Sequence, residues 1–498
     1  MARAIDVTAE GLEREVDRLE KIAAPGPREI GQRGRLARQR IDSLTDHREY
    51  RNVCCSGTNQ RTVRIAALLP TRLVTGTAST ADYSRVGDAS CGRDADAAVL
   101  DWRNPITKTE PGPGEMAIDQ ASSRRATLPP DISQVVLVLQ GGGALGAYRV
   151  GVYQALHEAG IEPDWVIGTS IGAINASLIA GNDVADRLSR LKEFWSRVQQ
   201  GPFHQAIAPM PLFGGLVANW LTVAGGIPGF FKPNPFAFAG PHIPLSAGSA
   251  AFYSTEPLEQ TLIELVDFTR VERHATRLTV GAANVRTGEM RYFDSRDTQL
   301  NAKHVIASGA LPPAFPAVRI DGDLYWDGGI LSNTPVEAVF DDQPRRNSLV
   351  FVVDLWNPHG SEPETIWQVL NRQKDIQYAS RAVTHTVRQK QLHRLRHVVS
   401  ELVKHIPEQL RQTPEVRSLA EYGCLTRMHV VRLLAPTIDG EDHTKDIDFS
   451  PAAIRARSAA GYADTSCVIT MAPWEGEFDA MEGVILHEAR TGIEINSG

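Results

Sequence analysis

Apolar and polar positions show no sustained period over the first 130 residues, and a regular pattern begins near Ser133. Residues 135–139 form an unbroken apolar run, which is typical of a strand covered on both faces. Helical spacing follows over 144–159, and a second apolar strand is predicted at 165–167. This alternation of strand and helix predicts an α/β fold, a layered and largely parallel sheet with helices on both faces.

The same alternation continues to an apolar strand at 349–355. Between these limits the pattern predicts further helices over 171–180, from an Asp183 cap to 198, over 257–266, over 302–308 and from about Thr334. It also predicts strands at 278–285 and 290–293, and hairpin turns at 286–289 and 321–323. We therefore place one α/β domain at 133–355, ending near Pro358.

Two flanking regions differ from this domain. Apart from a short charged helix at 12–22, residues 1–130 look weakly ordered and end in a Pro- and Gly-rich linker. Residues 356–498 are predicted to form a mostly helical extension, with helices over 361–412 and 451–462 around a strand at 428–434. Its first helical stretch is basic, which fits either a solvated face or a helix lying on an anionic membrane.

The segment 201–251 is dense in Gly, Pro and Phe and carries almost no charge. Its glycines and prolines recur too often for an uninterrupted membrane-spanning helix. Two interpretations remain open: an apolar lid or acyl-chain wall over an active site, or a long loop packed on the core.

Composition narrows the function classes. The 498 residues carry a net charge of −7, which disfavours nucleic acid as a partner. Five cysteines, without metal-ligand spacing, predict neither a metal site nor a disulfide framework, and no cofactor is indicated. Charges throughout residues 1–19 leave no apolar signal-peptide segment. We expect a cytoplasmic protein, with peripheral contact at the inner membrane surface.

The strongest chemical signal is a Gly-x-Ser-x-Gly sequence between a predicted strand and helix, formed by Gly168, Ser170 and Gly172. Such an elbow exposes one serine hydroxyl as a nucleophile. Ser170 then needs a base for its proton and donors for the oxyanion of the tetrahedral intermediate. The motif alone is a weak signal, because ordinary glycine turns produce it as well.

Backbone donors for an oxyanion are available in the glycine run Gly141, Gly142 and Gly143, at the start of a helix. With Gly146 the run also satisfies the Gly-x-Gly-x-x-Gly spacing of a dinucleotide-binding loop. That fold requires an acidic ribose ligand about 20 residues further on, at the end of the second strand. Here that strand ends in the serine elbow, which favours an oxyanion hole.

A carboxylate follows a short apolar run at Asp327, before Gly328 and Gly329. The glycines allow a sharp turn and the close approach of another chain segment. An aspartate hydrogen-bonded to Ser170 would act directly as its base, whereas an ordinary Asp-Gly turn would have no catalytic role.

Together, these three motifs resemble the patatin-like phospholipase family in order and placement, over about 133–355. The resemblance implies a lipid acyl ester hydrolase with a Ser170–Asp327 dyad and no cofactor. It also implies an oxyanion hole at Gly142 and Gly143, helped by Gly141 and Gly146. Many members carry Lys or Arg where this chain has Leu145, so cationic help for a phosphate head group is in doubt. Residues after 355 resemble the C-terminal extension of a bacterial subgroup.

Two other functions stay open. The first is a Ser–Asp–His esterase of the α/β-hydrolase type, whose histidine would be His385 or His393. The second is a membrane-associated scaffold without catalysis. His157 and His304 lie on amphipathic helices, where surface or packing roles are simplest.

Overall fold

The computed structural model describes residues 128–200, 224–239, 244–273, 275–438 and 441–489. The predicted helix at 12–22, and nearly all of the linker, lie outside these residues. No helix among them is long and apolar enough to cross a membrane. The described residues all belong to one compact unit.

The centre of this unit is a nine-stranded sheet with the order β11-β10-β9-β1-β2-β5-β8-β7, and β6 also pairs with β5. The strands are β1 (Gln134–Leu139), β2 (Trp165–Thr169), β5 (Arg277–Asn284), β6 (Met290–Asp294), β7 (Val318–Ile320), β8 (Asp323–Asp327), β9 (Ser348–Asp354), β10 (Met428–Leu434) and β11 (Val484–Ala489). Neighbours from β11 to β5 are parallel, while β6, β7 and β8 pair in antiparallel fashion. The predicted α/β class is confirmed.

Side chains alternate across the sheet and meet helices on both faces. From β1, Val135, Leu137 and Leu139 join one core with helices α4, α5, α6 and α16, while Val136 and Val138 pack with α12. These helices are α4 (Tyr148–Glu158), α5 (Ile171–Ala180), α6 (Val184–Arg197), α12 (Glu337–Phe340) and α16 (Pro451–Met471). Because both faces are buried, β1 contains only apolar residues beyond Gln134.

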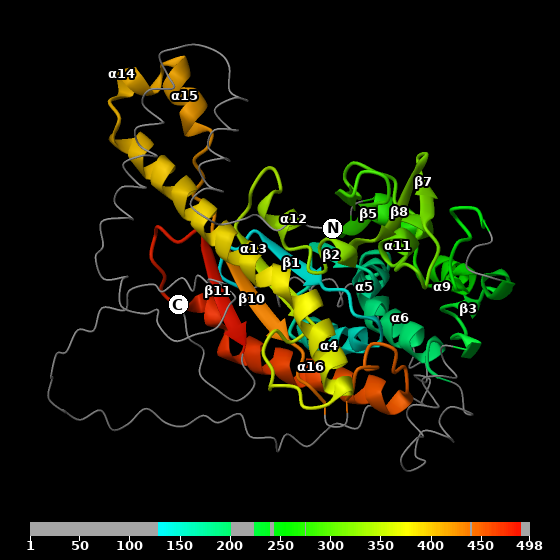
Figure 1. Ribbon diagram of the computed structural model, residues 1–498. Coiled ribbons are helices and arrows are strands. Elements are labelled where there is room, and N and C mark those ends of the chain that lie inside the picture. The colour runs from blue at the N-terminus through cyan, green and yellow to red at the C-terminus, as the bar shows by residue number, and fades with distance from the viewer. Residues whose placement is uncertain (1–127, 201–223, 240–243, 274, 439–440, 490–498) are drawn as a thin grey trace, which may run out of the picture. The chain divides into compact units, whose positions relative to one another are not determined.

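The predicted domain end near Pro358 is not the end of the sheet. The extension supplies β10, which pairs in parallel with β9, and β11, which pairs with β10. All seven residues of β9 are buried, so its outer edge needs this hydrogen-bonding partner. The extension also contains α13 (Ile366–His405), α14 (Glu408–Arg411) and α15 (Pro414–Ala420). In Figure 1, α13 runs across the sheet and continues beyond it toward α14 and α15.

Helices α4 and α16 approach one another closely at two glycines. A Cβ on Gly151 would lie 1.8 Å from the Ser458 carbonyl oxygen, and one on Gly461 would lie 2.0 Å from the Tyr148 carbonyl oxygen. The predicted final helix at 451–462 is therefore part of a longer helix that packs its backbone directly against α4.

Most other local predictions are confirmed, including both hairpins. The remaining elements are η3 (Gly143–Ala147), β3 (Lys232–Pro233), η4 (Pro235–Ala239), β4 (Tyr253–Ser254), α9 (Glu256–Leu265), α10 (Phe268–Glu272), α11 (Ala302–Ser308), η5 (Gly328–Ile330) and η6 (Pro473–Glu475). Asp183 is the N-cap residue of α6, but its side chain makes no cap hydrogen bond. Its carboxylate forms an ion pair with Arg270 instead.

Candidate active site

Ser170 occupies a strained turn between β2 and α5. Its backbone has φ 58° and ψ −129°, a conformation that non-glycine residues rarely adopt. The turn is sharp enough that a Cβ on Gly168 would lie 2.3 Å from the Gly172 carbonyl oxygen, and one on Gly172 2.2 Å from that of Leu139. Both elbow glycines are therefore required by close backbone contacts.

Ser308, the last residue of α11, accepts hydrogen bonds from the backbone of the elbow. The Ser170 N–H donates to the Ser308 carbonyl oxygen at 3.1 Å and to its Oγ at 3.0 Å. The Ser308 hydroxyl in turn donates to the Gly281 carbonyl oxygen on β5 at 2.6 Å. This chain of contacts fixes the serine backbone against the sheet.

Asp327 ends β8 and is only 2% exposed. Its Oδ1 accepts a hydrogen bond from the Gly329 N–H at 2.7 Å. Burial raises the pKa of Asp327 from 3.8 to about 6, while hydrogen bonds from the Ser170 side chain and the Gly329 N–H act in the opposite direction. Gly328 lies against β5, where a Cβ would come within 2.4 Å of the Gly281 carbonyl oxygen. The structure thus brings the predicted serine and aspartate together.

The glycine run lies between β1 and η3, next to the serine. The Gly141 N–H donates to the Asn333 carbonyl oxygen at 3.0 Å, so it is already used. Within the described residues, the N–H groups of Gly142 and Gly143 have no hydrogen-bond acceptor. Gly146 instead packs against the α5 and α6 side, where a Cβ would meet Ile171 and Trp195. The two N–H groups left available are those of Gly142 and Gly143.

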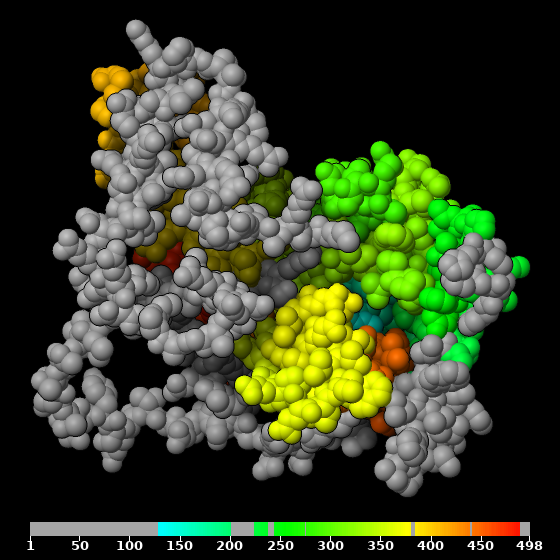
Figure 2. All heavy atoms as spheres, in the orientation of Figure 1, coloured from blue at the N-terminus to red at the C-terminus, as the bar shows by residue number. Residues whose placement is uncertain are grey.

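A cavity of about 280 Å³ opens at Ser170, Asp327 and the glycine run. Its other lining residues come mainly from apolar segments: Ile171, Ile174, Phe230, Phe231, Tyr253, Thr255, Leu258, Leu311, Ala314, Phe315, Asn333, Trp356, Tyr378, Asp446, Ile447 and Phe449. In the described part of this lining there is no lysine, arginine or histidine. Figure 2 shows a hollow here, between the yellow start of α13, an orange segment and the green segment that includes β4.

Arg149 does not reach this cavity. It is 1% exposed, and within the described residues its guanidinium nitrogens have no hydrogen-bond acceptor. Burial lowers the pKa of Arg149 to about 9, against a smaller opposing effect of Asp354. One of its terminal nitrogens lies against Gly146, on the inner side of η3. The cation missing at Leu145 is therefore not replaced from the next helical turn.

Several cavity residues were not identified from the sequence. Tyr378 of α13 lines the cavity together with Asp327 and Asp446. Burial, followed by the negative charges of Asp327 and Asp446, raises the pKa of Tyr378. Trp356 donates from Nε1 to the Gly141 carbonyl oxygen at 2.9 Å. Trp356 follows the carboxyl end of the parallel strand β9. Ligand sites lie at such strand ends, so this position could have identified Trp356 from the sequence. Tyr378 and Asp446 stand in no recognisable motif.

The histidine triad is not assembled. The His385 ring lies 3.6 Å from a Glu337 carboxylate oxygen, outside the cavity. His393 is buried against Phe340 on the other face of the sheet, and burial followed by nearby cations lowers its pKa to about 3. His157 binds Glu162, and His304 completes a capping box with Asn301 on α11. No described cluster of acidic, histidine and cysteine side chains could hold a metal ion.

Two family profiles match the chain. One is described as Patatin-like phospholipase and covers residues 137–340, and the other is described as Patatin phospholipase and covers residues 376–481. Together they include the serine elbow, the aspartate and most of the C-terminal extension.

Curated relatives show the same similarity over part of the chain. Lysophospholipase nte1 of Aspergillus niger is 25% identical over 246 residues, which is 48% of this chain and 13% of that protein. Patatin-like phospholipase domain-containing protein 6 of Mus musculus is 34% identical over 104 residues, or 19% of this chain and 8% of that protein. The chain thus spans only a small part of the length of these relatives.

Among solved structures, VipD from Legionella pneumophila aligns with a TM-score of 0.32 and 18% identity, over 69% of this chain and 67% of that one. Human GIVD cytosolic phospholipase A2 aligns with a TM-score of 0.27 and 13% identity, over 47% and 45% of the two chains.

Proposed function

Since this chain belongs to the patatin-like phospholipase family, we propose that it is a serine acyl ester hydrolase acting on lipid esters. Ser170 is the nucleophile and Asp327 is its base. The observation that carries this proposal is that Ser170, in its strained turn, and the buried Asp327 carboxylate line the same apolar cavity beside the glycine run.

Acylation begins when Asp327 accepts the Ser170 hydroxyl proton and the serine oxygen attacks the acyl carbonyl carbon. The carbonyl oxygen becomes an oxyanion, and the N–H groups of Gly142 and Gly143 donate to it. Collapse of the intermediate releases the alcohol, which takes the proton held by Asp327. The acyl group is then bound to Ser170 as an ester.

Deacylation repeats these steps with water. Asp327 accepts a proton from the water, whose oxygen attacks the acyl-serine carbonyl, and the same two N–H groups stabilise the second oxyanion. The fatty acid leaves and the proton returns to Ser170. An aspartate with a pKa of about 6 suits this work, because it is ionised at neutral pH yet basic enough to accept a proton.

The acyl chain of the substrate occupies the aromatic part of the cavity, against Phe230, Phe231 and Phe315. Phe230 and Phe231 support the acyl-wall interpretation of the segment 201–251, of which residues 201–223 and 240–243 lie outside the described residues. Because the described lining offers no cation, the head group remains at the mouth without an ionic partner there. A single-chain ester, such as a lysophospholipid or a monoacylglycerol, fits one cavity of this size.

We also propose that the mouth contacts a lipid surface peripherally. Large apolar side chains are exposed on two segments that contribute to this side of the unit. These are Phe236 and Phe252 beside β3 and β4, and Ile366, Trp367, Val369 and Leu370 at the start of α13. The cytoplasmic location expected from the sequence is compatible with such contact and stays a prediction.

Hydrolysis of p-nitrophenyl acyl esters and of lysophospholipid vesicles tests the function, with Ser170→Ala and Asp327→Asn beside the wild type. Each substitution should lower kcat by roughly 10³-fold or more while circular dichroism stays unchanged. His385→Ala is the matched control and should retain activity. Turnover that survives Ser170→Ala would refute the proposed nucleophile.

A further inference from the structure

The loop 441–449 of the C-terminal extension reaches the active site. Its residues Asp446, Ile447 and Phe449 line the cavity together with Ser170. Phe449 packs against Phe230 and stacks with Trp195, with ring centroids 5.8 and 6.1 Å apart. The extension therefore supplies part of the apolar wall that an acyl chain would contact.

The same loop contacts the glycine run that we assign to the oxyanion. The Ala144 N–H donates to the Asp446 carbonyl oxygen at 2.8 Å. Gly143 adopts φ +54° at this contact, and a Cβ there would lie 2.2 Å from the same oxygen. The position of the Asp446 backbone thus fixes the residue that follows Gly143, and with it the direction of the Gly143 N–H.

Two crossed ion pairs hold the loop against α13. Lys374 binds the Asp446 carboxylate at 2.6 and 2.9 Å, and the next residue, Asp375, binds Lys445 at 2.7 Å. The first pair is partly exposed, with side-chain exposures of 34% and 23%, whereas the second is buried at 6% and 11%. The Lys445 ammonium also lies 5.4 Å from the Trp356 ring centre. Each segment has a lysine followed by an aspartate, and the first residue of one segment binds the second residue of the other. Both pairs can form only when the loop and α13 are aligned in one register.

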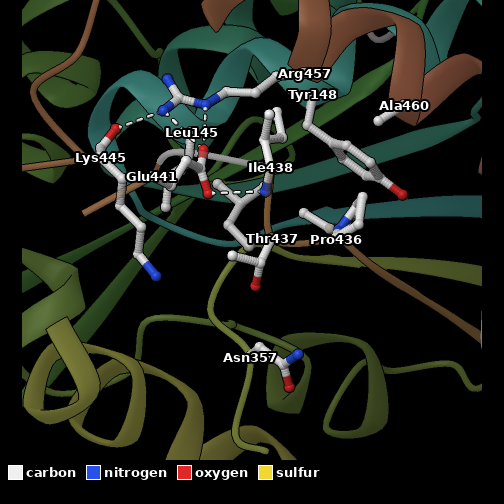
Figure 3. A pocket seen from close by; sticks show the side chains of 12 residues that line it. Leu145, Tyr148, Asn357, Pro436, Thr437, Ile438, Glu441, Lys445, Arg457 and Ala460 are labelled. Atoms are coloured by element: carbon white, nitrogen blue, oxygen red, sulfur yellow. Dashed lines mark hydrogen bonds and ion pairs between the residues drawn. The ribbon is translucent and has the colours of Figure 1, made fainter. Parts of the chain in front are cut away.

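Arg457 of α16 holds the loop from its other side, as Figure 3 shows. This side chain is 3% exposed and donates to the Glu441 carboxylate at 3.0 and 3.1 Å. It also donates to the carbonyl oxygens of Lys445 and Asp448, both at 2.9 Å. The buried guanidinium therefore makes four hydrogen bonds to this loop, two of them to its backbone carbonyl oxygens.

We propose that the loop 441–449 is a working part of the active site, resting on the proposed hydrolase function. Its Asp446 backbone orients the oxyanion donors, and its Phe449 side chain determines which acyl chain lengths fit. Lys374 and Asp446 are positioning residues, since they act through the glycine run and not on the substrate. The extension is then an obligatory half of the catalytic centre.

The first experiment reverses one ion pair in three variants: Lys374→Asp, Asp446→Lys and the two together. Each single change should lower kcat for p-nitrophenyl butyrate roughly 10- to 100-fold, because it displaces the oxyanion donors. The double variant rebuilds the pair with reversed charges and should recover most of the lost kcat. Lys404→Asp, which breaks an exposed pair with Glu401 at the far end of α13, is the control and should not change kcat. Unchanged kcat in both single variants would overturn the positioning role.

The second experiment does not require turnover. The binding of fatty acids of increasing length to the Ser170→Ala protein is compared with binding after Phe449→Ala is added. Removing the Phe449 ring should shift the preferred length toward longer chains, while Phe478→Ala, outside the cavity, should leave it unchanged. An unshifted preference would overturn the specificity role. An inactive wild type with a shifted preference would instead refute the hydrolase function and keep the assignment of the cavity wall.

Discussion

Replacing Asp327 by Asn should stabilise the fold at neutral pH while it abolishes turnover. Asp327 is 2% exposed and has no cationic partner among the causes of its shifted pKa. Burial raises that pKa from 3.8 to about 6, which corresponds to about 3 kcal/mol at about 1.36 kcal/mol for each pH unit. Asparagine keeps the oxygen that accepts from the Gly329 N–H and carries no charge. The active-site carboxylate therefore costs the wild type stability that the variant regains.

The contribution of Asp327 to the free energy of unfolding depends on pH. Between the unfolded pKa and the folded pKa of about 6, the native protein holds the proton of Asp327 more tightly than the unfolded chain does. The contribution of this group therefore falls as pH rises through that window, and the full cost is present above it. Below the unfolded pKa, wild type and variant should be about equally stable.

Urea unfolding at about pH 7.5 and about pH 4.5 measures the full cost of the carboxylate and its decrease within this window. Asp294→Asn is the matched control with the opposite expectation. Burial alone would raise the pKa of Asp294, but hydrogen bonds from Arg277 and Thr279 lower it, so its removal should destabilise the protein at neutral pH. An Asp327→Asn protein no more stable than wild type at the higher pH would refute the reasoning.

Three further predictions follow from the site and the packing. The value of kcat/KM should rise with pH through about 6, as Asp327 ionises, and a flat profile from pH 5 to 8 would contradict its role as base. Gly461→Ala should destabilise the protein by about 3 kcal/mol or more in thermal or urea unfolding, since its Cβ would lie 2.0 Å from a carbonyl oxygen of α4. Gly225→Ala, with no atom within 4 Å of the new Cβ, should change stability little. His385→Ala should keep kcat within about twofold, and a large loss would restore the histidine triad as an explanation.

The sequence was informative where structure follows from neighbouring residues. The strand β1 and the helix α5 appear as continuous patterns, and α5 has the predicted bounds. The elbow is also local, because Gly168 and Gly172 must lie beside each other whenever Ser170 projects from a tight turn. The dyad itself required two distant motifs, and only their joint resemblance to one family placed them together.

The rest of the site depends on long-range contacts that leave no local pattern. The strand at 428–434 was predicted with its bounds, but nothing in its composition showed that its partner would be β9. β11 was not anticipated, because a short strand near the C-terminus has weak periodicity. Asp446 and Phe449 reach the cavity from a loop whose position is set by Lys374, Asp375 and Arg457, none of which stands in a motif.

The contact between the Ala144 N–H and the Asp446 carbonyl oxygen has a consequence for synthesis on the ribosome. The nucleophile, its carboxylate and seven strands of the sheet, from β1 to β9, are made well before residue 446. The glycine run receives its last partner only after the loop and α16 have left the ribosome and packed against α4. A nascent chain therefore gathers its reactive groups early, and the geometry that would let them work is completed among the last steps of folding.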